Sequence, residues 1–396
     1  MRVLLYIPKS KNTDMKELFA SALTEEMDKF ATVSVCSTLP QVRKMTKEHA
    51  SDILHIIGCN TIHAYQALRI AEKHGVLVVV SPLGDLMPWN RNASDKAGST
   101  FYQEKMIREA DAIHVGSEME QELMKTLAWN TRQELVRNSI VTNQITQRQM
   151  VFAMFRLYQK VIDSNTFRLM SDDEKQMENI LLRCGLWLTH HDPNADEALF
   201  YPLSPEDPEG KRLIGNLSEE SLRKILLHAN DENVIDYVRT GAEHLKIQAQ
   251  SVDIDNIDRF EQKLRKPHEP LPTDRLSARH AMKNKIRFDH LRQDEKPSDI
   301  EMALCYLFVN VDYALQRHTL TRRHLAQLYS LLRYKDYDED KLERMLSRLQ
   351  MKPFASHILQ ILHESLGLEE GFMPIAPKNN KTTDSIRRKL QNINIQ

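Results

Sequence analysis

The residues of this chain that could do chemistry follow short apolar runs within its first 150 residues. Asp85 stands beside Gly84, directly after the run at residues 76–80. A carboxylate at this place can bind the hydroxyl groups of a ligand or act as a general base, and it can equally be a turn residue. Trp89, at the end of the same segment, could stack on a ligand ring or clamp the loop.

Two other apolar runs end in similar candidates. Gly58 ends the run at residues 53–57, and Ser117 and Glu118 follow the run at 112–115. Ser117 can also be the cap of a helix that begins at Glu118, because a serine before an acidic first turn is typical of helix starts.

Histidine spacing does not indicate a metal site. His55 and His114 lie within apolar runs, which is typical of core or strand-end residues. His190, His191 and Asp192 are adjacent in the chain, and adjacent side chains point in different directions, so we expect a solvated helix end there. The sequence therefore predicts no metal and no cofactor.

A parallel sheet is needed to bring the candidate residues together. Up to residue 148, short β-branched runs alternate with helical patterns, and parallel strands require such crossovers. We predict a Rossmann-like α/β domain over residues 1–148, with ligands beyond the carboxyl ends of its strands. The expected strands are 3–7, 33–36, 53–57, 76–80, 112–115 and 134–136, and the expected helices are 15–29, 41–47, 61–74, 101–110 and 118–126.

After residue 150 the apolar residues recur with a period near 3.6, which indicates a mainly α-helical C-terminal half. A solvated, flexible tail is expected at the end, although its lysines and arginines could also bind an acidic partner. The predicted parts are a helical region at 149–251, a charged linker with four prolines at 252–298, a helical bundle at 299–372 and a flexible basic tail at 373–396.

Composition narrows the class of protein. The formal net charge is -1, so no overall field attracts nucleic acid or an anionic membrane. The four cysteines form no CxxC pair, which argues against a zinc site or a disulfide framework and favours a reducing compartment. No apolar stretch approaches the ~20 residues of a membrane span, and we expect a cytoplasmic protein.

The first third of the chain resembles the amino-terminal, acceptor-side domain of GT-B glycosyltransferases, in particular the retaining family-four type. The resemblance is carried by five segments in order, at residues 52–58, 75–76, 81–89, 110–120 and 136–140. It implies a cleft that binds a glycan acceptor or a nucleotide-sugar. The residues that it makes candidates for substrate binding are Gly58, Gly84, Asp85, Trp89, Ser117, Glu118 and Asn138.

The sequence also departs from the family pattern. Leu83 stands where a cleft-facing histidine is usual, and residues 8–13 lack the glycines of the first loop. The family's second Rossmann-like domain, with its diphosphate-binding arginine and lysine and its pair of glutamates, has no counterpart among the helical patterns after residue 150. Glu369, Glu370 and Gly371 come nearest to the glutamate pair, and we read them as a helix end.

These departures favour a glycosyltransferase-like protein with an incomplete catalytic apparatus, which binds glycans or has an accessory or regulatory role in polysaccharide metabolism. The first alternative is an active retaining hexosyltransferase with a nucleotide-sugar donor. The second is a non-catalytic scaffold that works through a protein partner of its helical half. We assign no catalytic residue.

Overall fold

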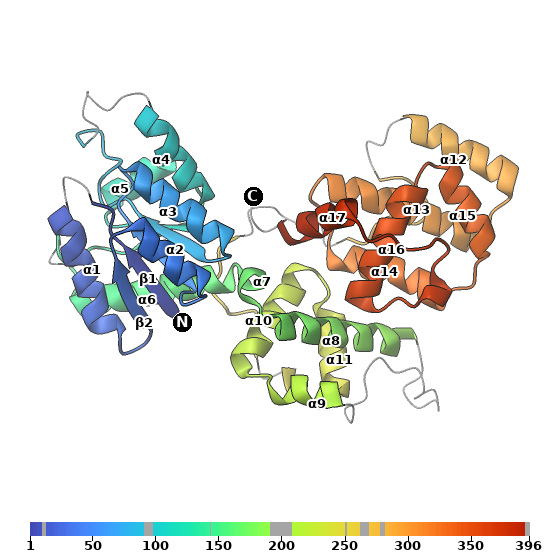
Figure 1. Ribbon diagram of the computed structural model, residues 1–396, viewed down its shortest axis with the longest axis horizontal. Helices are drawn as coiled ribbons and strands as arrows, with labels where there is room; N and C mark the ends of the chain where they lie inside the picture. Colours follow the sequence, from blue (N-terminus) through green and yellow to red (C-terminus); the bar gives the residue numbers. More distant parts are fainter. Residues whose placement is uncertain are drawn as a thin grey trace. The chain divides into compact units, whose positions relative to one another are not determined.

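The computed structural model describes residues 1–9, 13–90, 98–142, 144–190, 208–249, 252–261, 269–277 and 282–392. The chain divides into two compact units (Figure 1). Unit 1 comprises Met1–Leu169 and Ile257–Glu261, and unit 2 comprises Met170–Asn256 and Gln262–Gln396. The boundary therefore lies after residue 169, not after residue 148 as the sequence analysis expected.

Unit 1 contains one six-stranded, all-parallel sheet in the order β2-β1-β3-β4-β5-β6. This arrangement confirms the predicted Rossmann-like α/β fold. The strands are β1 Arg2–Tyr6, β2 Thr32–Cys36, β3 Ile53–Ile57, β4 Leu77–Ser81, β5 Ala112–Val115 and β6 Gln133–Leu135. Strands β3, β4 and β5 are buried at every position, as expected for strands covered by helices on both faces.

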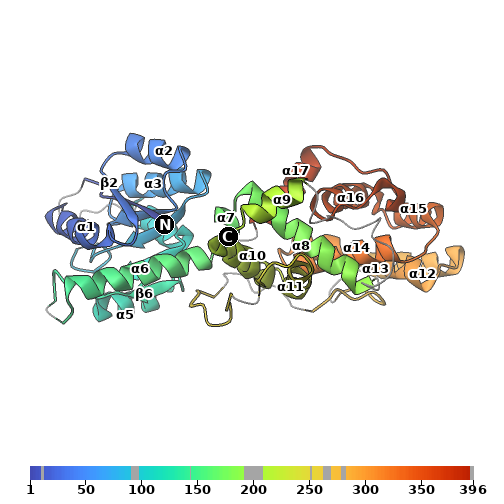
Figure 2. The ribbon, with the colours of Figure 1, turned by 90° about the horizontal axis from the view of Figure 1, so that it is seen from below.

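Helices cover both faces of this sheet. One buried cluster joins Leu5 to residues of α1 and α6, and a second joins Leu4 to residues of α2, α3, α4 and α5. Figure 2 shows α2 and α3 on the opposite side of the sheet from α6. The helices are α1 Thr13–Met27, α2 Leu39–Lys47, α3 Ile62–Lys73, α4 Gly98–Glu109, α5 Glu118–Leu127, α6 Gln147–Asp163 and α7 Thr166–Leu169.

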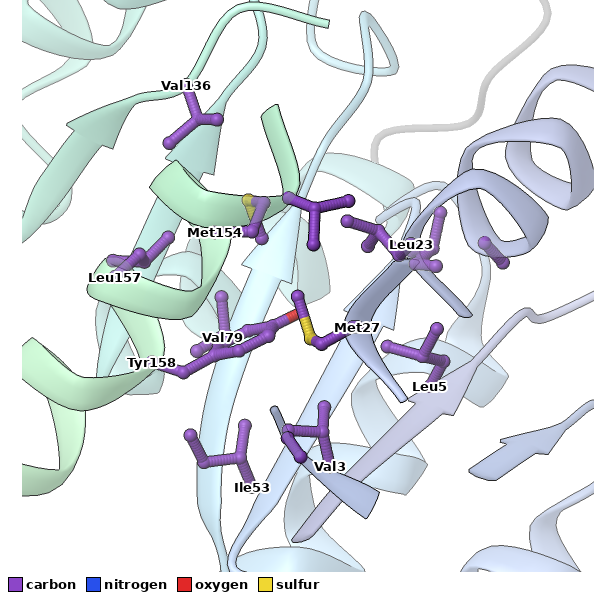
Figure 3. Packing of buried hydrophobic residues seen from close by; sticks show 14 of the residues in the cluster. Val3, Leu5, Leu23, Met27, Ile53, Val79, Val136, Met154, Leu157 and Tyr158 are labelled. Carbon is purple, nitrogen blue, oxygen red and sulfur yellow. The ribbon is translucent and has the colours of Figure 1, made fainter. Parts of the chain in front are cut away.

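Helix α6 accounts for the shift of the domain boundary. Its buried face includes Met154, Leu157 and Tyr158, which lie in one cluster with Val79 of β4 and Met27 of α1 (Figure 3). The sequence pattern predicts that α6 belongs to the helical region. An apolar stripe of period 3.6 does not show whether a helix packs on a sheet or on other helices.

A chain of buried hydrogen bonds also ties α6 to the sheet. Tyr158 Oη lies 2.7 Å from His55 Nδ1, and His55 Nε2 lies 2.5 Å from Ser81 Oγ. Ser81 Oγ lies 2.6 Å from His114 Nδ1, and His114 Nε2 lies 2.8 Å from the carbonyl of Val136. Both histidines are buried core residues, the simpler of the expectations for them.

The direction of each bond in this chain follows from its last acceptor. A carbonyl can only accept, so His114 Nε2 carries a proton and Nδ1 accepts from the hydroxyl of Ser81. Ser81 Oγ then accepts from His55 Nε2, and Tyr158 donates to His55 Nδ1. Both rings are neutral, in agreement with burial, which holds the pKa of His55 well below its usual range and lowers that of His114 to about 4.

The described part of unit 2 is helical, which confirms the predicted helical C-terminal half. Among the described helices of the chain, none is long and apolar enough to cross a membrane. The elements of unit 2 are α8 Asp172–His190, α9 Pro208–Gly215, α10 Glu219–Asp231, α11 Ile235–His244, α12 Met282–Glu295, α13 Asp299–Gln316, α14 Arg322–Tyr334, α15 Glu339–Arg348, α16 Lys352–Leu366, η3 Glu370–Phe372 and α17 Lys381–Asn392.

Two glycines set the closest helix contact in unit 2. A Cβ atom on Gly185 of α8 would lie 1.9 Å from the carbonyl oxygen of Tyr237. A Cβ atom on Gly241 of α11 would lie 2.1 Å from the carbonyl oxygen of Leu181. The two helices therefore pack backbone against backbone, which only glycine permits.

The C-terminal segment differs from the expected flexible tail over its described residues, 373–392. Helix α17 packs on α16, with Ile386 buried and with Thr383 Oγ1 2.9 Å from His357 Nδ1. Arg387 forms an ion pair with Glu364 at 2.6 Å. The segment is an amphipathic helix with a narrow apolar face. Its high share of lysine and arginine indicates a solvated tail instead, so the helix could not be recognised from composition.

The expected linker at 252–298 is also partly ordered. Helix α12 lies within it, and residues 257–261 pack on unit 1. The backbone N–H of Phe260 donates to Ser164 Oγ at 2.8 Å, and Lys160 pairs with Asp258 at 3.0 Å. His190 stacks on the ring of Tyr334, whereas residues 191–192 of the expected solvated helix end lie outside the described residues.

Candidate functional site

A pocket of about 440 Å³ lies in unit 1, at the carboxyl edge of the sheet. It is formed by the start of α1, by the loops after β4 and β5, and by the segment after β6. These are the positions where ligands bind in open α/β sheets. The lining residues are Asp14, Met15, Lys16, Leu83, Gly84, Asp85, Met87, Gly116, Ser117, Glu120, Asn138 and Val141.

A buried ion pair forms one wall of the pocket. Lys16 Nζ lies 2.9 Å from Asp85 Oδ2 and 3.2 Å from Oδ1, and both side chains are almost fully buried. Asp85 Oδ2 also accepts from the backbone N–H of Cys59 at 2.7 Å. The pair joins α1 to the loops after β3 and β4, and the two charges neutralise each other.

Gly58 is needed beside this pair. Its φ is +96°, in the region that favours glycine, and a Cβ atom would lie 2.3 Å from Lys16 Nζ. Any side chain at position 58 would therefore displace the lysine from Asp85.

Glu120 joins two of the loops that shape the pocket. Its Oε1 accepts from the backbone N–H of Gly84 at 2.8 Å, and its Oε2 accepts from that of Gly116 at 2.8 Å. Burial, aided by the charge of Asp85, raises the pKa of Glu120, and the two backbone donors oppose that rise. Each carboxylate oxygen has a further lone pair with which it can accept a hydrogen bond from a ligand.

Asn138 and Ser117 supply donors. Asn138 is 5% exposed, and its Oδ1 accepts from the backbone N–H of Ile140 at 2.9 Å. Its amide nitrogen has no hydrogen-bond partner among the described residues, so its two N–H groups are free for a ligand. Ser117 Oγ accepts from the N–H of Glu120 at 3.2 Å as the cap of α5, which leaves its hydroxyl proton to donate.

The rest of the lining is apolar. Leu83 has a φ of 46°, an unusual value for leucine, and it lies in the pocket wall together with Met87. Met15 and Val141 also line the pocket, and they are 43% and 70% exposed. A ligand here would meet both polar groups and apolar side chains.

The structure brings four of the seven candidate residues together. Gly84, Asp85, Ser117 and Asn138 line the pocket, and Gly58 lies behind its ion pair. The other two candidates are not among the lining residues. Trp89 is 65% exposed, and Glu118 is an exposed residue that pairs with Arg137 at 2.5 Å.

Lys16, Glu120 and Asp14 line the pocket although the sequence does not predict them as site residues. Lys16 is separated from Asp85 by 69 positions, and in the sequence it is one of several charged residues of a helix. Glu120 stands three residues after Ser117, a spacing typical of a capping box, but its side chain crosses to Gly84 instead. The spacing could have drawn attention to Glu120; no pattern singles out Lys16.

The chemistry available in the pocket is hydrogen bonding by carboxylate, amide and hydroxyl groups. Among the described residues, no group of three or more His, Cys, Asp or Glu side chains is placed to hold a metal ion. The fold and the pocket together define a Rossmann-like unit with a pocket of mixed polar and apolar lining at the carboxyl edge of its sheet.

The comparison with protein families agrees with this class. Residues 25–139 match the family described as a glycosyl transferase 4-like domain. The match extends from α1 to the segment after β6, and it ends before unit 2 begins. The N-terminal unit thus contains a glycosyltransferase 4-like domain. Searches of the curated proteins and of the solved structures found no match to the chain.

Proposed function

We propose that the pocket of unit 1 binds a sugar of a glycan, and that this chain does not transfer sugar by itself. The observation that carries the proposal is the set of groups that meet in the pocket. Asn138 and Ser117 offer donors, Glu120 offers an acceptor, and apolar side chains face them. Vicinal hydroxyl groups require donors and acceptors side by side, with an apolar surface for the C–H groups.

The helical unit 2 supports the second part of this proposal. A GT-B enzyme of the resembled type holds its nucleotide-sugar on a second Rossmann-like domain, whereas the described residues of unit 2 form helices. Transfer with retention also needs positive groups against the leaving diphosphate. The described cation in the pocket, Lys16, is bound to Asp85. The proposed role is therefore accessory or regulatory.

Calorimetric titration with methyl glycosides of common hexoses tests sugar binding. The informative variant is Asn138→Asp, which keeps the acceptor for Ile140 but removes both amide donors. We expect it to weaken the binding of neutral glycosides about tenfold, in line with the loss of one or two good hydrogen bonds. Asn60→Asp makes the same chemical change at an exposed position outside the pocket and should leave affinity unchanged.

A thermal-shift screen with UDP-, GDP- and ADP-sugars tests the absence of donor binding. A ligand at ~100 times its dissociation constant adds about 2.7 kcal/mol to the free energy of unfolding, which is readily seen. A clear shift with one of these nucleotides, abolished by removal of its sugar, would replace the proposal with the alternative of an active hexosyltransferase. If neither glycosides nor nucleotide-sugars bind, the scaffold alternative is favoured.

A further inference from the structure

We infer that the pocket selects a sugar with a free ammonium group over neutral and phosphorylated sugars. The inference rests on the proposed function, because it names the class of sugar that the same pocket would take. It is drawn from the charges that line the pocket and from an unpartnered buried amide beside them.

The charges that line the pocket are mostly negative. Three carboxylates, those of Asp14, Asp85 and Glu120, meet one cation, Lys16, among the described lining residues. Lys16 contacts both oxygens of Asp85, so this pair has little net effect on a ligand. The carboxylates of Asp14 and Glu120 are the remaining charged side chains among the described lining residues.

Glu120 is the carboxylate that gains most from a cationic ligand. It is 3% exposed, and its described hydrogen bonds come from two neutral backbone groups, at 2.8 Å each. A buried charge without an opposite charge is costly, and its pKa is accordingly raised by burial. An ammonium group in the pocket would supply the missing opposite charge, whereas a phosphate would add a like charge.

Asn138 makes the pocket specific for a sugar and not for any amine. Asn138 is almost fully buried, with 5% of its surface exposed. Its amide N–H groups have no hydrogen-bond partner among the described residues. They face a space that Glu120 and Ser117 also line. A ligand with both an amine and neighbouring hydroxyl groups satisfies the carboxylate and the amide together, which a simple alkyl amine does not.

Calorimetric titration of the full chain with three matched probes tests this inference. The probes are methyl glucosaminide, methyl glucoside and methyl glucoside 6-phosphate. We expect the glucosaminide to bind about tenfold more tightly than the glucoside, the scale of one partly screened charge pair, and the phosphate to bind most weakly. The preference should disappear when the pH is raised above the pKa of the ligand amine, because the ammonium group is then neutral.

Two variants assign the preference to the pocket. Asp14→Asn removes an exposed charge at the start of α1, and we expect it to reduce the preference for the glucosaminide about threefold. Glu120→Gln should reduce it further, and its far-ultraviolet circular dichroism shows whether the unit still folds. Glu17→Gln is the matched control, since Glu17 lies on the same helix, is exposed and lines a different pocket.

The outcomes separate the two proposals. Equal affinity for glucosaminide and glucoside, or a preference that neither Asp14→Asn nor Glu120→Gln reduces, overturns the ammonium inference while sugar binding stands. Binding of none of the three probes overturns the proposed function and the inference with it. Tightest binding of methyl glucoside 6-phosphate would mean that the field in the pocket is positive, which contradicts the inference directly.

Discussion

A substitution in the buried hydrogen-bond chain of unit 1 should lower the free energy of unfolding in proportion to the number of buried polar groups that it leaves without a partner. Tyr158→Phe removes one hydroxyl and leaves His55 Nδ1 without its donor. Ser81→Ala also removes one hydroxyl, but it leaves both His55 Nε2 and His114 Nδ1 without partners. Both substitutions delete a single oxygen from a fully buried site, so their packing costs are similar.

The expected magnitudes follow from the cost of an unsatisfied buried group, about 1–3 kcal/mol. Tyr158→Phe should therefore lower the free energy of unfolding of unit 1 by about 1–3 kcal/mol, and Ser81→Ala by about 2–6 kcal/mol. The ratio of the two losses in unfolding free energy is better defined than either loss, because uncertainty in the cost of one unsatisfied group affects both variants alike.

Hydrogen exchange followed by mass spectrometry is the suitable assay, because it reports the opening of each unit separately. Amides in peptides from β3, β4 and β5 should lose protection in both variants, and more in Ser81→Ala. Ser356→Ala is the control, since Ser356 is a buried serine in α16 of unit 2 and should leave these peptides unchanged. Equal loss of protection in the two variants would refute the premise that Ser81→Ala leaves two buried groups unpaired and Tyr158→Phe only one.

Three further predictions concern stability. Asp85→Ala should destabilise unit 1 by about 3–5 kcal/mol in chemical denaturation, because Lys16 would lose its buried carboxylate; unchanged stability would mean that the pair is dispensable. His114 is neutral in the folded state with a pKa of about 4, against 6.5 when unfolded, so it contributes stability that is complete above pH 6.5 and lost as the pH falls toward 4. The part of that loss due to His114 should be about 3 kcal/mol in urea titrations across this window, with a further loss from His55, and a flat profile would contradict both. Truncation after Asn380 should lower the melting temperature of unit 2, because Ile386 is buried against α16; an unchanged melting temperature would show that α17 is not docked.

The α/β part of the fold could be predicted from the sequence because its strands are buried on both faces. Such strands are uninterrupted apolar runs, and the expected strand at 53–57 coincides with β3, while that at 76–80 differs from β4 by one residue at each end. Alternation with helices then fixes a parallel arrangement. The strand order and the partner of each helix are absent from this local pattern.

The candidate site could be predicted only where it follows the strand ends. Gly84, Asp85 and Ser117 stand directly after apolar runs, so their position at the carboxyl edge follows from topology. Lys16 and Glu120 enter the pocket through long-range contacts that depend on how α1 and α5 pack on the sheet. For the same reason the docking of α17 could not be predicted, since burial of a single isoleucine leaves little periodicity to detect.

The glycine pair of α8 and α11 has an evolutionary consequence. Since each glycine faces a carbonyl oxygen of the opposite helix, a descendant of this protein cannot replace either one unless the helices separate. Nor can it gain or lose a residue inside either helix on one side of the crossing, because that shift would set a side chain where the glycine had been. Relatives that share this unit should therefore show glycine at both positions, with insertions confined to the loops between helices.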